Sequence, residues 1–498
     1  MRKAVLLASS VLSIGLAFSC NTQEFETNAI LDPIKIDTGY VSGTMIGEVG
    51  KEVRIYRGIP YAAPPVGELR WKPPQPPAPW SGIRECTDFG KSAPQPAGPI
   101  DLAFMPQSED CLYLNVLTPA KEASDNLPVM VWLHGGGYLG GSGSDPLFNL
   151  PRLPQNGVVL VTINMRLGSL GLLAHPLLSN ESPKGISGNY MFFDMIAALE
   201  WVQRNIAAFG GNSENLTIFG ESGGGWKVSC LTASPLANAL FHKAIFQSGV
   251  TGEQSPGVPM NDMELIGEKF FARLGVEKEA DPLKAARALP SDRIIETERS
   301  LSEELNKSDG LCDSAIDGRF LTNTPAEIFR AGKQNPMPVI TSANLGELTG
   351  PGNYLMPHLI PDYVNILNGV NRASQKGYAC IFDQVPSKWK QEGCVSFHAI
   401  ELAYVFGDWG NSAGWLSLTF KLLAEPAGAK TLEPGFTDLD RKISENLMAM
   451  WAQFARTGDP NVEGFINWPA YDTEIDQYLY IAEPLQVKPG FSKVAQKE

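Results

Sequence analysis

Leu216-Thr217-Ile218-Phe219 is followed directly by Gly220-Glu221-Ser222-Gly223-Gly224, and this junction decides the fold. The first four residues are apolar or β-branched, as in a buried strand, and the glycines permit a tight, strained turn. This order is typical of a nucleophile elbow, the sharp strand-to-helix turn that holds a serine hydroxyl clear of a sheet edge. The pentamer alone is weak evidence, because short motifs recur by chance. Its weight depends on the rest of the chain.

Other stretches repeat the order of strand and helix. Near-continuous apolar runs predict strands that are buried on both faces of a sheet, at residues 129–133, 158–164 and 337–342. Helices are expected at residues 194–205 and 443–454, with glycine stops at Gly210 and Gly458. The stretch 240–245 is also expected to be helical. The alternation predicts an α/β fold with a large, mostly parallel central sheet and helices on both faces, in one domain at residues 37–498.

Composition excludes several classes of protein. The chain has 498 residues, of which 43% are hydrophobic, and this content is enough for a sizeable core. A formal net charge of −14 argues against a nucleic-acid partner, because phosphate binding requires clustered Lys and Arg. The five histidines and seven cysteines show no metal-ligand spacing. We therefore expect no metal site.

The N-terminus indicates export. Arg2-Lys3 precede a short apolar run at residues 4–18, which is too short for a comfortable membrane span and typical of a signal peptide covering residues 1–20. The segment Ala17–Cys20 resembles the acylation signal of bacterial lipoproteins, although Leu is usual at the position of Ala17. Cys20 would then be lipidated and become the mature N-terminus, followed by a tether at residues 21–36. The expected location is the periplasm or the outer membrane, with the anchor as the only membrane contact; secretion after plain cleavage is the alternative.

A second glycine motif follows another predicted strand. His134-Gly135-Gly136-Gly137-Tyr138 comes directly after Leu133. Consecutive glycines leave backbone N–H groups accessible to a ligand, and this motif is typical of the loop that stabilises an oxyanion. Two such motifs, each behind a strand, occur together by chance much more rarely than either alone. A glycine turn without a ligand role is the alternative.

With these motifs in place, the chain resembles the carboxylesterase type B (cholinesterase-like) family of α/β-hydrolases, nearly from end to end. The stretches that carry the resemblance are Gly58–Ala62 with Pro65–Gly67 and Leu69-Arg70, Glu109–Val116, Asn164–Gly168, Trp201–Gly211, Phe219–Gly224, Asp317–Phe320 and Trp451–Pro460. Gly223 stands where the family usually has Ala. The resemblance implies that Ser222 is the nucleophile and that the backbone N–H groups of Gly136, Gly137 and Gly223 stabilise the oxyanion.

The other two members of the catalytic triad follow from chain order. In α/β-hydrolases the acid and then the histidine follow the serine, so only His242, His358 and His398 are candidates. His398 precedes Glu401–Gly407, which is similar to the family's segment around its catalytic histidine. Glu347 ends a loop directly after the predicted strand, where the family places its acid, although its neighbours Gly346 and Leu348 depart from the usual pattern.

The resemblance implies acyl transfer by a Ser-His-Glu triad through an acyl-enzyme, on small to medium carboxylic esters, with water as the second substrate. This mechanism requires no metal and no organic cofactor. Hydrolysis of amide, thioester or carbonate bonds by the same triad is an alternative. A non-catalytic binding protein of the same fold is a further alternative.

Three departures from the family lead to further expectations. Glu347 and His398 are only 51 residues apart, so we expect a more open active site than the family usually has. Trp226 stands where smaller residues are usual, and it either shapes the pocket or packs in the core. The cysteines form disulfides or remain buried thiols; the pairs considered are Cys380 with Cys394 and, in place of the family's bridge, Cys86 with Cys111.

Overall fold

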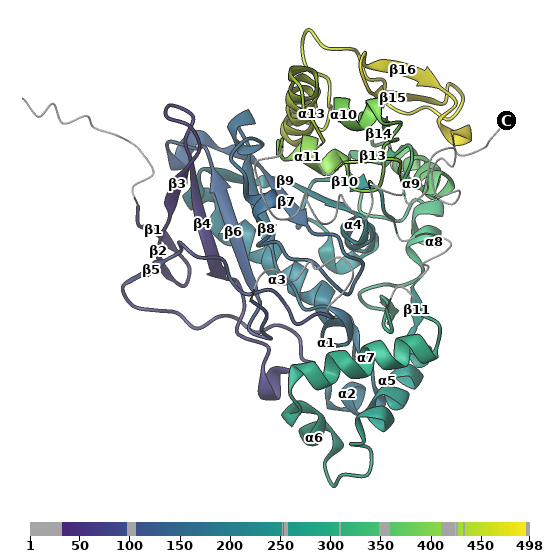
Figure 1. Cartoon of the computed structure of the whole chain (residues 1–498). Helices are drawn as coiled ribbons and strands as arrows, with labels where there is room; N and C mark the ends of the chain where they lie inside the picture. The colour runs from purple at the N-terminus through teal and green to yellow at the C-terminus, as the bar shows by residue number, and fades with distance from the viewer. Residues whose placement is uncertain are drawn as a thin grey trace, which may run out of the picture.

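The computed structural model describes residues 32–96, 106–250, 252, 257–307, 310–347, 359–409, 424, 427–431 and 434–494. A central sheet of eleven strands runs through this part of the chain (Figure 1). In spatial order its strands are β16 (Gln486–Pro489), β15 (Gln477–Ile481), β14 (Gly377–Phe382), β13 (Val339–Asn344), β10 (Lys243–Gln247), β9 (Gly211–Glu221), β7 (Leu127–Leu133), β8 (Val159–Ile163), β6 (Tyr113–Thr118), β4 (Val53–Pro60) and β3 (Thr44–Ile46). The seven strands from β15 to β8 run parallel to one another, and the strands beyond them at both edges pair antiparallel with their neighbours.

Smaller strands and the helices complete the described fold. A three-stranded sheet at the N-terminal side contains β1 (Ile34–Ile36), β2 (Gly39–Ser42) and β5 (Ile83–Glu85), and a two-stranded one contains β11 (Val258–Pro259) and β12 (Ala315–Ile316). The helices are α1 (Gly168–Leu172), α2 (Pro176–Glu181), α3 (Tyr190–Asn205), α4 (Gly223–Ala233), α5 (Met260–Leu274), α6 (Pro282–Ala288), α7 (Ser291–Glu304), α8 (Pro325–Arg330), α9 (Leu359–Arg372), α10 (Ser387–Gln391), α11 (Glu401–Val405) and α13 (Asp438–Thr457).

The central sheet separates two hydrophobic cores. Side chains of successive residues in a strand point to opposite faces, so Val129, Val131 and Leu133 of β7 belong to one core, whereas Met130 and Trp132 belong to the other. Helices α3, α4 and α9 contribute to the first core, and α11 and α13 contribute to the second. Because both faces of β7 are covered, its sequence is continuously apolar rather than alternating. The predicted α/β fold, with a mostly parallel sheet and helices on both faces, is confirmed.

Most of the predicted elements are present with slightly different ends. The four predicted strands correspond to β7, β8, β9 and β13, and the two predicted helices correspond to α3 and α13. Helix α13 ends at Gly458, which has φ 79°. The prediction of a helix at residues 240–245 is wrong. Residues from Lys243 onward form β10, a fully buried strand between β9 and β13, where pairing within the sheet outweighs the local helix preference of a short apolar run.

Candidate active site

The predicted strand-to-helix turn lies at Ser222, between the end of β9 and the start of α4. Ser222 has φ 56° and ψ −124°, a backbone conformation that costs free energy in any residue other than glycine. The turn is held by a hydrogen bond from the N–H of Ser222 to the carbonyl of Gln247 (2.9 Å), and the carbonyl of Ser222 accepts from the N–H of Trp226 (3.1 Å). The strained geometry places the serine at the carboxyl end of β9.

Two glycines that pack against the elbow leave no room for a side chain. A Cβ atom on Gly224 would lie 2.1 Å from the carbonyl oxygen of Leu133, and one on Gly249 would lie 2.0 Å from the carbonyl oxygen of Ser222. Both distances are shorter than a Cβ atom can approach another heavy atom, so a side chain at either position would force the backbone to move. The elbow is therefore wedged between the ends of β7 and β10.

His398 and Glu347 form a buried pair. Nδ1 of His398 lies 2.6 Å from Oε2 of Glu347, whose side chain is fully buried. The other carboxylate oxygen accepts a hydrogen bond from the N–H of Asn344 (2.7 Å), and the N–H of His398 donates to the carbonyl of Glu347 (3.1 Å). With side chain and backbone both fixed, Nδ1 is the protonated nitrogen, and Nε2 is left to face the elbow.

Nε2 of His398 faces a residue that the sequence analysis did not select. Oε1 of Glu221, the residue before Ser222, lies 3.1 Å from this nitrogen, and Glu221 is 4% exposed. Glu401 is also buried, and it accepts hydrogen bonds from Asn344 (2.6 Å) and Gln247 (3.1 Å). Glu221 stands inside the elbow motif, and Glu401 opens the segment that resembles the family's histidine region. Their positions within these two motifs were the only features of the sequence that could have indicated a role for Glu221 and Glu401 at the site.

The carboxylates around His398 control its proton affinity. Burial alone lowers the pKa of the imidazole, but the negative charges of Glu221, Glu347 and Glu401 outweigh burial and raise this pKa above its usual value. Burial in turn raises the pKa of Glu221, although His398 opposes the rise. Burial raises the pKa of Glu401 to about 7. His398 and Glu221 therefore compete for protons as a coupled pair.

The glycine loop after β7 lies against the elbow. A Cβ atom on Gly223 would lie 2.5 Å from the backbone nitrogen of Gly137, and one on Gly135 would lie 3.5 Å from Cβ of Ser222. Gly136 and Gly137 have φ values of 88° and 62°, which favour glycine. The structure thus brings together all the predicted site residues that it describes: Ser222, Glu347, His398, Gly136, Gly137 and Gly223. Cys20 and His358 lie outside the described residues.

Trp226 both packs and borders this loop. Its indole ring makes an edge-to-face contact with Tyr138, with ring centroids 5.6 Å apart, and it packs against the first hydrophobic core. The same ring lies 4.0 Å from the position of a Cβ atom on Gly137. Trp226 therefore supports the loop from the side of α4, as expected of a packing residue, and its role in shaping the substrate pocket stays a prediction.

The disulfides that the sequence suggested are not formed. All six cysteines within the described residues, Cys86, Cys111, Cys230, Cys312, Cys380 and Cys394, are free thiols, and each is buried. The pairs of Cys380 with Cys394 and of Cys86 with Cys111 are thus wrong. Cys380 lies in the central strand β14 and Cys394 follows α10, and both belong to the second core as small apolar side chains.

The described part of the chain contains neither a metal site nor a helix that could span a membrane. No group of three or more His, Cys, Asp and Glu side chains there could hold a metal ion. In the same part of the chain, no helix combines the length and the apolar character needed to cross a membrane.

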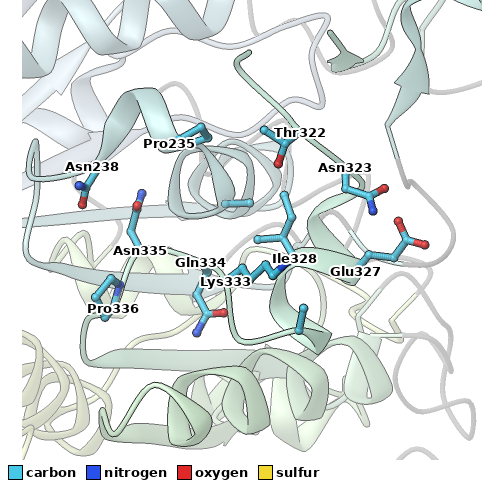
Figure 2. A pocket seen from close by; sticks show the side chains of 12 residues that line it. Pro235, Asn238, Thr322, Asn323, Glu327, Ile328, Lys333, Gln334, Asn335 and Pro336 are labelled. Atoms are coloured by element: carbon cyan, nitrogen blue, oxygen red, sulfur yellow. The ribbon is translucent and has the colours of Figure 1, made fainter. Parts of the chain in front are cut away.

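A large surface cavity lies away from Ser222. It has a volume of about 640 Å³ and is bordered by the end of α4, by α8 and by the segment before β13 (Figure 2). Thr322, Asn323 and Glu327 lie along one side of it, and Asn238 and Asn335 lie along the other. None of the residues that line it belongs to the elbow, the glycine loop or the His398–Glu347 pair.

Comparisons with known proteins agree with this geometry. The chain matches the model of the carboxylesterase family over residues 32–362 and 358–497. It is 34% identical over 500 positions to para-nitrobenzyl esterase of Bacillus subtilis (strain 168), covering 90% of this chain and 94% of that protein. It is 32% identical to carboxylesterase 1C of Mus musculus, covering 92% and 91% of the two chains.

A solved structure gives the same result for the fold. The structure of a thermophilic PNB esterase superimposes with a TM-score of 0.77 and 28% identity, and the match covers 91% of this chain and 97% of the other. The extent of these matches, together with the elbow and the glycine loop, leads to one conclusion. The chain belongs to the carboxylesterase family and is a carboxylic ester hydrolase.

Proposed function

We propose that Ser222 is the nucleophile of this esterase, that His398 is its general base and acid, and that Glu347 orients the imidazole. One observation carries the proposal: the Glu347-bound imidazole of His398 presents Nε2 to the elbow residue Glu221, directly beside Ser222. A serine hydroxyl needs a neighbouring base, and the base needs a third group that fixes its tautomer. Ser222 and Glu347 follow β9 and β13, which lie on either side of β10 in the sheet, and His398 lies between α10 and α11.

The reaction proceeds in two acyl-transfer steps. Nε2 of His398 takes the proton of Ser222 while Oγ attacks the ester carbonyl, and the tetrahedral oxyanion receives hydrogen bonds from the N–H groups of Gly136, Gly137 and Gly223. His398 then gives the proton to the departing alcohol, leaving an acyl-enzyme on Ser222. Water attacks this ester with the same histidine as base, and the acid is released.

We propose small to medium carboxylic esters as the substrate class. The names of para-nitrobenzyl esterase and carboxylesterase 1C support esters as a class and do not fix the acyl or alcohol part. An open site, as expected from the short Glu347–His398 segment, accepts acyl chains of increasing length without a sharp cutoff.

The test uses p-nitrophenyl esters of increasing acyl length, with protein that lacks residues 1–20. We expect Ser222→Ala to reduce turnover to the background rate. The control is Ser229→Ala, which removes a hydroxyl from the same helix; this hydroxyl donates to the carbonyl of Trp226 (2.9 Å). Wild-type turnover that persists in Ser222→Ala would refute the assignment of the nucleophile.

We further propose that the protein is exported and anchored through a lipid on Cys20. The basic start, the short apolar run and Ala17–Cys20 support this proposal. Mass spectrometry of the full-length product is expected to show a mature chain beginning with acylated Cys20. A soluble product without acyl groups would instead support secretion after plain cleavage.

A further inference from the structure

A buried lysine lies beneath the glycine loop, and the proposed mechanism does not use it. Lys227 is on α4, five residues after Ser222, and its side chain has no solvent exposure. Its Nζ atom donates one hydrogen bond to the carbonyl of His134 and another to the carbonyl of Gly137, each at 2.9 Å. An ammonium group is costly to bury, so its two acceptors indicate a specific role.

These two carbonyls belong to the residues at the two ends of the glycine loop. His134 is the residue before the three glycines, and Gly137 is the last of them. One side chain therefore joins the beginning of the loop to its end. Both acceptors are backbone atoms, so the interaction fixes peptide planes and not side chains.

The two remaining carbonyls of the loop are also engaged. The carbonyl of Gly135 lies 2.9 Å from Nδ1 of His134, and the carbonyl of Gly136 accepts from the N–H of Gly140 (3.0 Å). In a trans peptide the C=O and N–H bonds point in opposite directions. The N–H groups of Gly136 and Gly137 therefore point away from His134 and Gly140. With Lys227 at both ends, every carbonyl from His134 to Gly137 is fixed.

Gly223 fits the same arrangement. A Cβ atom on this residue would lie 2.2 Å from the carbonyl oxygen of Gly137, the atom that Lys227 holds. The alanine that is usual in the family at this position cannot be accommodated while Gly137 keeps this orientation. Glycine in place of alanine at position 223 and the buried Lys227 thus act on the same atom, the carbonyl oxygen of Gly137.

We propose that Lys227 is a positioning residue that holds the loop Gly135–Gly137 as an oxyanion site, and that Gly223 provides the space for this arrangement. The proposal rests on the proposed role of Ser222. It extends that role to the residue that fixes the peptide planes 134–135 and 137–138, which flank the two planes carrying the N–H groups of Gly136 and Gly137. Burial lowers the pKa of Lys227 to about 7, so the amine is partly protonated near neutral pH. In its protonated form it places positive charge behind the loop, where it favours an oxyanion more than a neutral ester. Loss of Lys227 therefore lowers kcat and changes KM little.

The experiment compares Lys227→Met with wild type on p-nitrophenyl acetate. Methionine keeps the length of the side chain and removes both hydrogen bonds. We expect kcat to fall by about 100-fold, the cost of misplacing the oxyanion donors by about 1 Å, with KM within about threefold of wild type. Lys243→Met is the matched control. Lys243 is also buried, but it hydrogen-bonds Asn215 and makes no contact with the glycine loop, so kcat stays within about threefold of wild type.

A second variant keeps the proposal testable if Lys227→Met does not fold. Gly223→Ala leaves the lysine in place and forces the carbonyl of Gly137 to move, and we expect it to lower kcat by at least about tenfold. Where both variants fold, the double variant is expected to lose less kcat than the product of the two single losses. Without the ammonium group of Lys227, nothing holds the carbonyl of Gly137 against the new methyl group.

The outcomes separate this inference from the proposed function. Activity that does not depend on Ser222 would overturn the proposed function itself. Ser222-dependent activity with unchanged kcat in Lys227→Met, or in Gly223→Ala if the first variant is unfolded, would overturn the role of Lys227 alone. Equal loss of kcat in Lys227→Met and Lys243→Met would show a general effect of removing a buried ammonium group, and would also overturn it.

Discussion

Oε1 of Glu221 lies 3.1 Å from Nε2 of His398, on the side of the imidazole opposite to Glu347. The nitrogen that must accept the proton of Ser222 is therefore in contact with a carboxylate. This contact favours the protonated imidazole and opposes its action as a base. It also stabilises the imidazolium that forms during acyl transfer. The same contact therefore weakens His398 as a base and lowers the free energy of the charged intermediate.

We expect Glu221→Gln to move the acidic limb of the pH–rate profile to lower pH. Wild type loses activity as pH falls through the pKa of His398, which the carboxylate of Glu221 raises. Without this charge the pKa falls, so the base stays neutral to lower pH. The measurement is kcat/KM for p-nitrophenyl acetate against pH. Glu200→Gln, on the exposed side of α3, is the control, and an unmoved limb in Glu221→Gln would contradict the assignment.

We expect Glu347→Gln to lower kcat by about 10³- to 10⁴-fold. The glutamine amide keeps the shape of the side chain, but it cannot stabilise the imidazolium or hold Nδ1–H as a carboxylate does. Steady-state kinetics with p-nitrophenyl acetate provide the measurement. A loss of less than about tenfold would assign the third member of the triad to another carboxylate, for which the buried Glu401 is a candidate because its charge acts on His398.

Arg166 and Asp194 provide a test of stability. Their bidentate pair, with contacts of 2.6 and 2.8 Å, is almost fully buried. Arg166→Met leaves the carboxylate buried without its charge partner, and we expect a loss of about 3–5 kcal/mol in the free energy of unfolding. Arg299→Met, which breaks exposed pairs on α7, should cost less than about 1 kcal/mol. Equal losses in urea denaturation would contradict this account of burial.

The cysteines give a direct chemical test. All six described thiols are buried and free, and burial raises the pKa of Cys111, Cys312 and Cys380 among them. Thiol reagent added to native protein lacking residues 1–20 should therefore react slowly, and all six thiols should react after denaturation. Reducing agent should leave Tm unchanged. Fewer than six reactive thiols in denatured, unreduced protein would reveal a disulfide.

The elements at the site could be predicted because their signals are local. A buried parallel strand followed by a glycine turn can be recognised from consecutive residues, as at Phe219–Gly224 and at Leu133–Gly137. The C-terminal end of α13 was equally readable from Gly458, whereas the helix begins at Asp438, five residues before the predicted start. Even so, the same kind of apolar pattern at residues 240–245 was misread, because a short run does not distinguish a helix from a central strand.

The contacts that tune the site could not be predicted, because they join residues distant in sequence. Glu221 meets His398 across 177 positions, and Lys227 reaches His134 from 93 positions away. Neither spacing has a periodic signature. The absence of disulfides among the described cysteines is also a property of packing, because Cys380 and Cys394 are near in sequence but are held by different elements of the second core.

The most direct test of the central claim is to locate the covalent intermediate. Wild type and Ser222→Ala are treated with a p-nitrophenyl phosphonate, which forms a stable adduct on an activated serine, and the digests are examined by peptide mass spectrometry. The account predicts one adduct in wild type, on the peptide containing Ser222, with release of one p-nitrophenol per chain and none in Ser222→Ala. An adduct on another residue, or turnover of p-nitrophenyl acetate by wild type without any adduct, would contradict it.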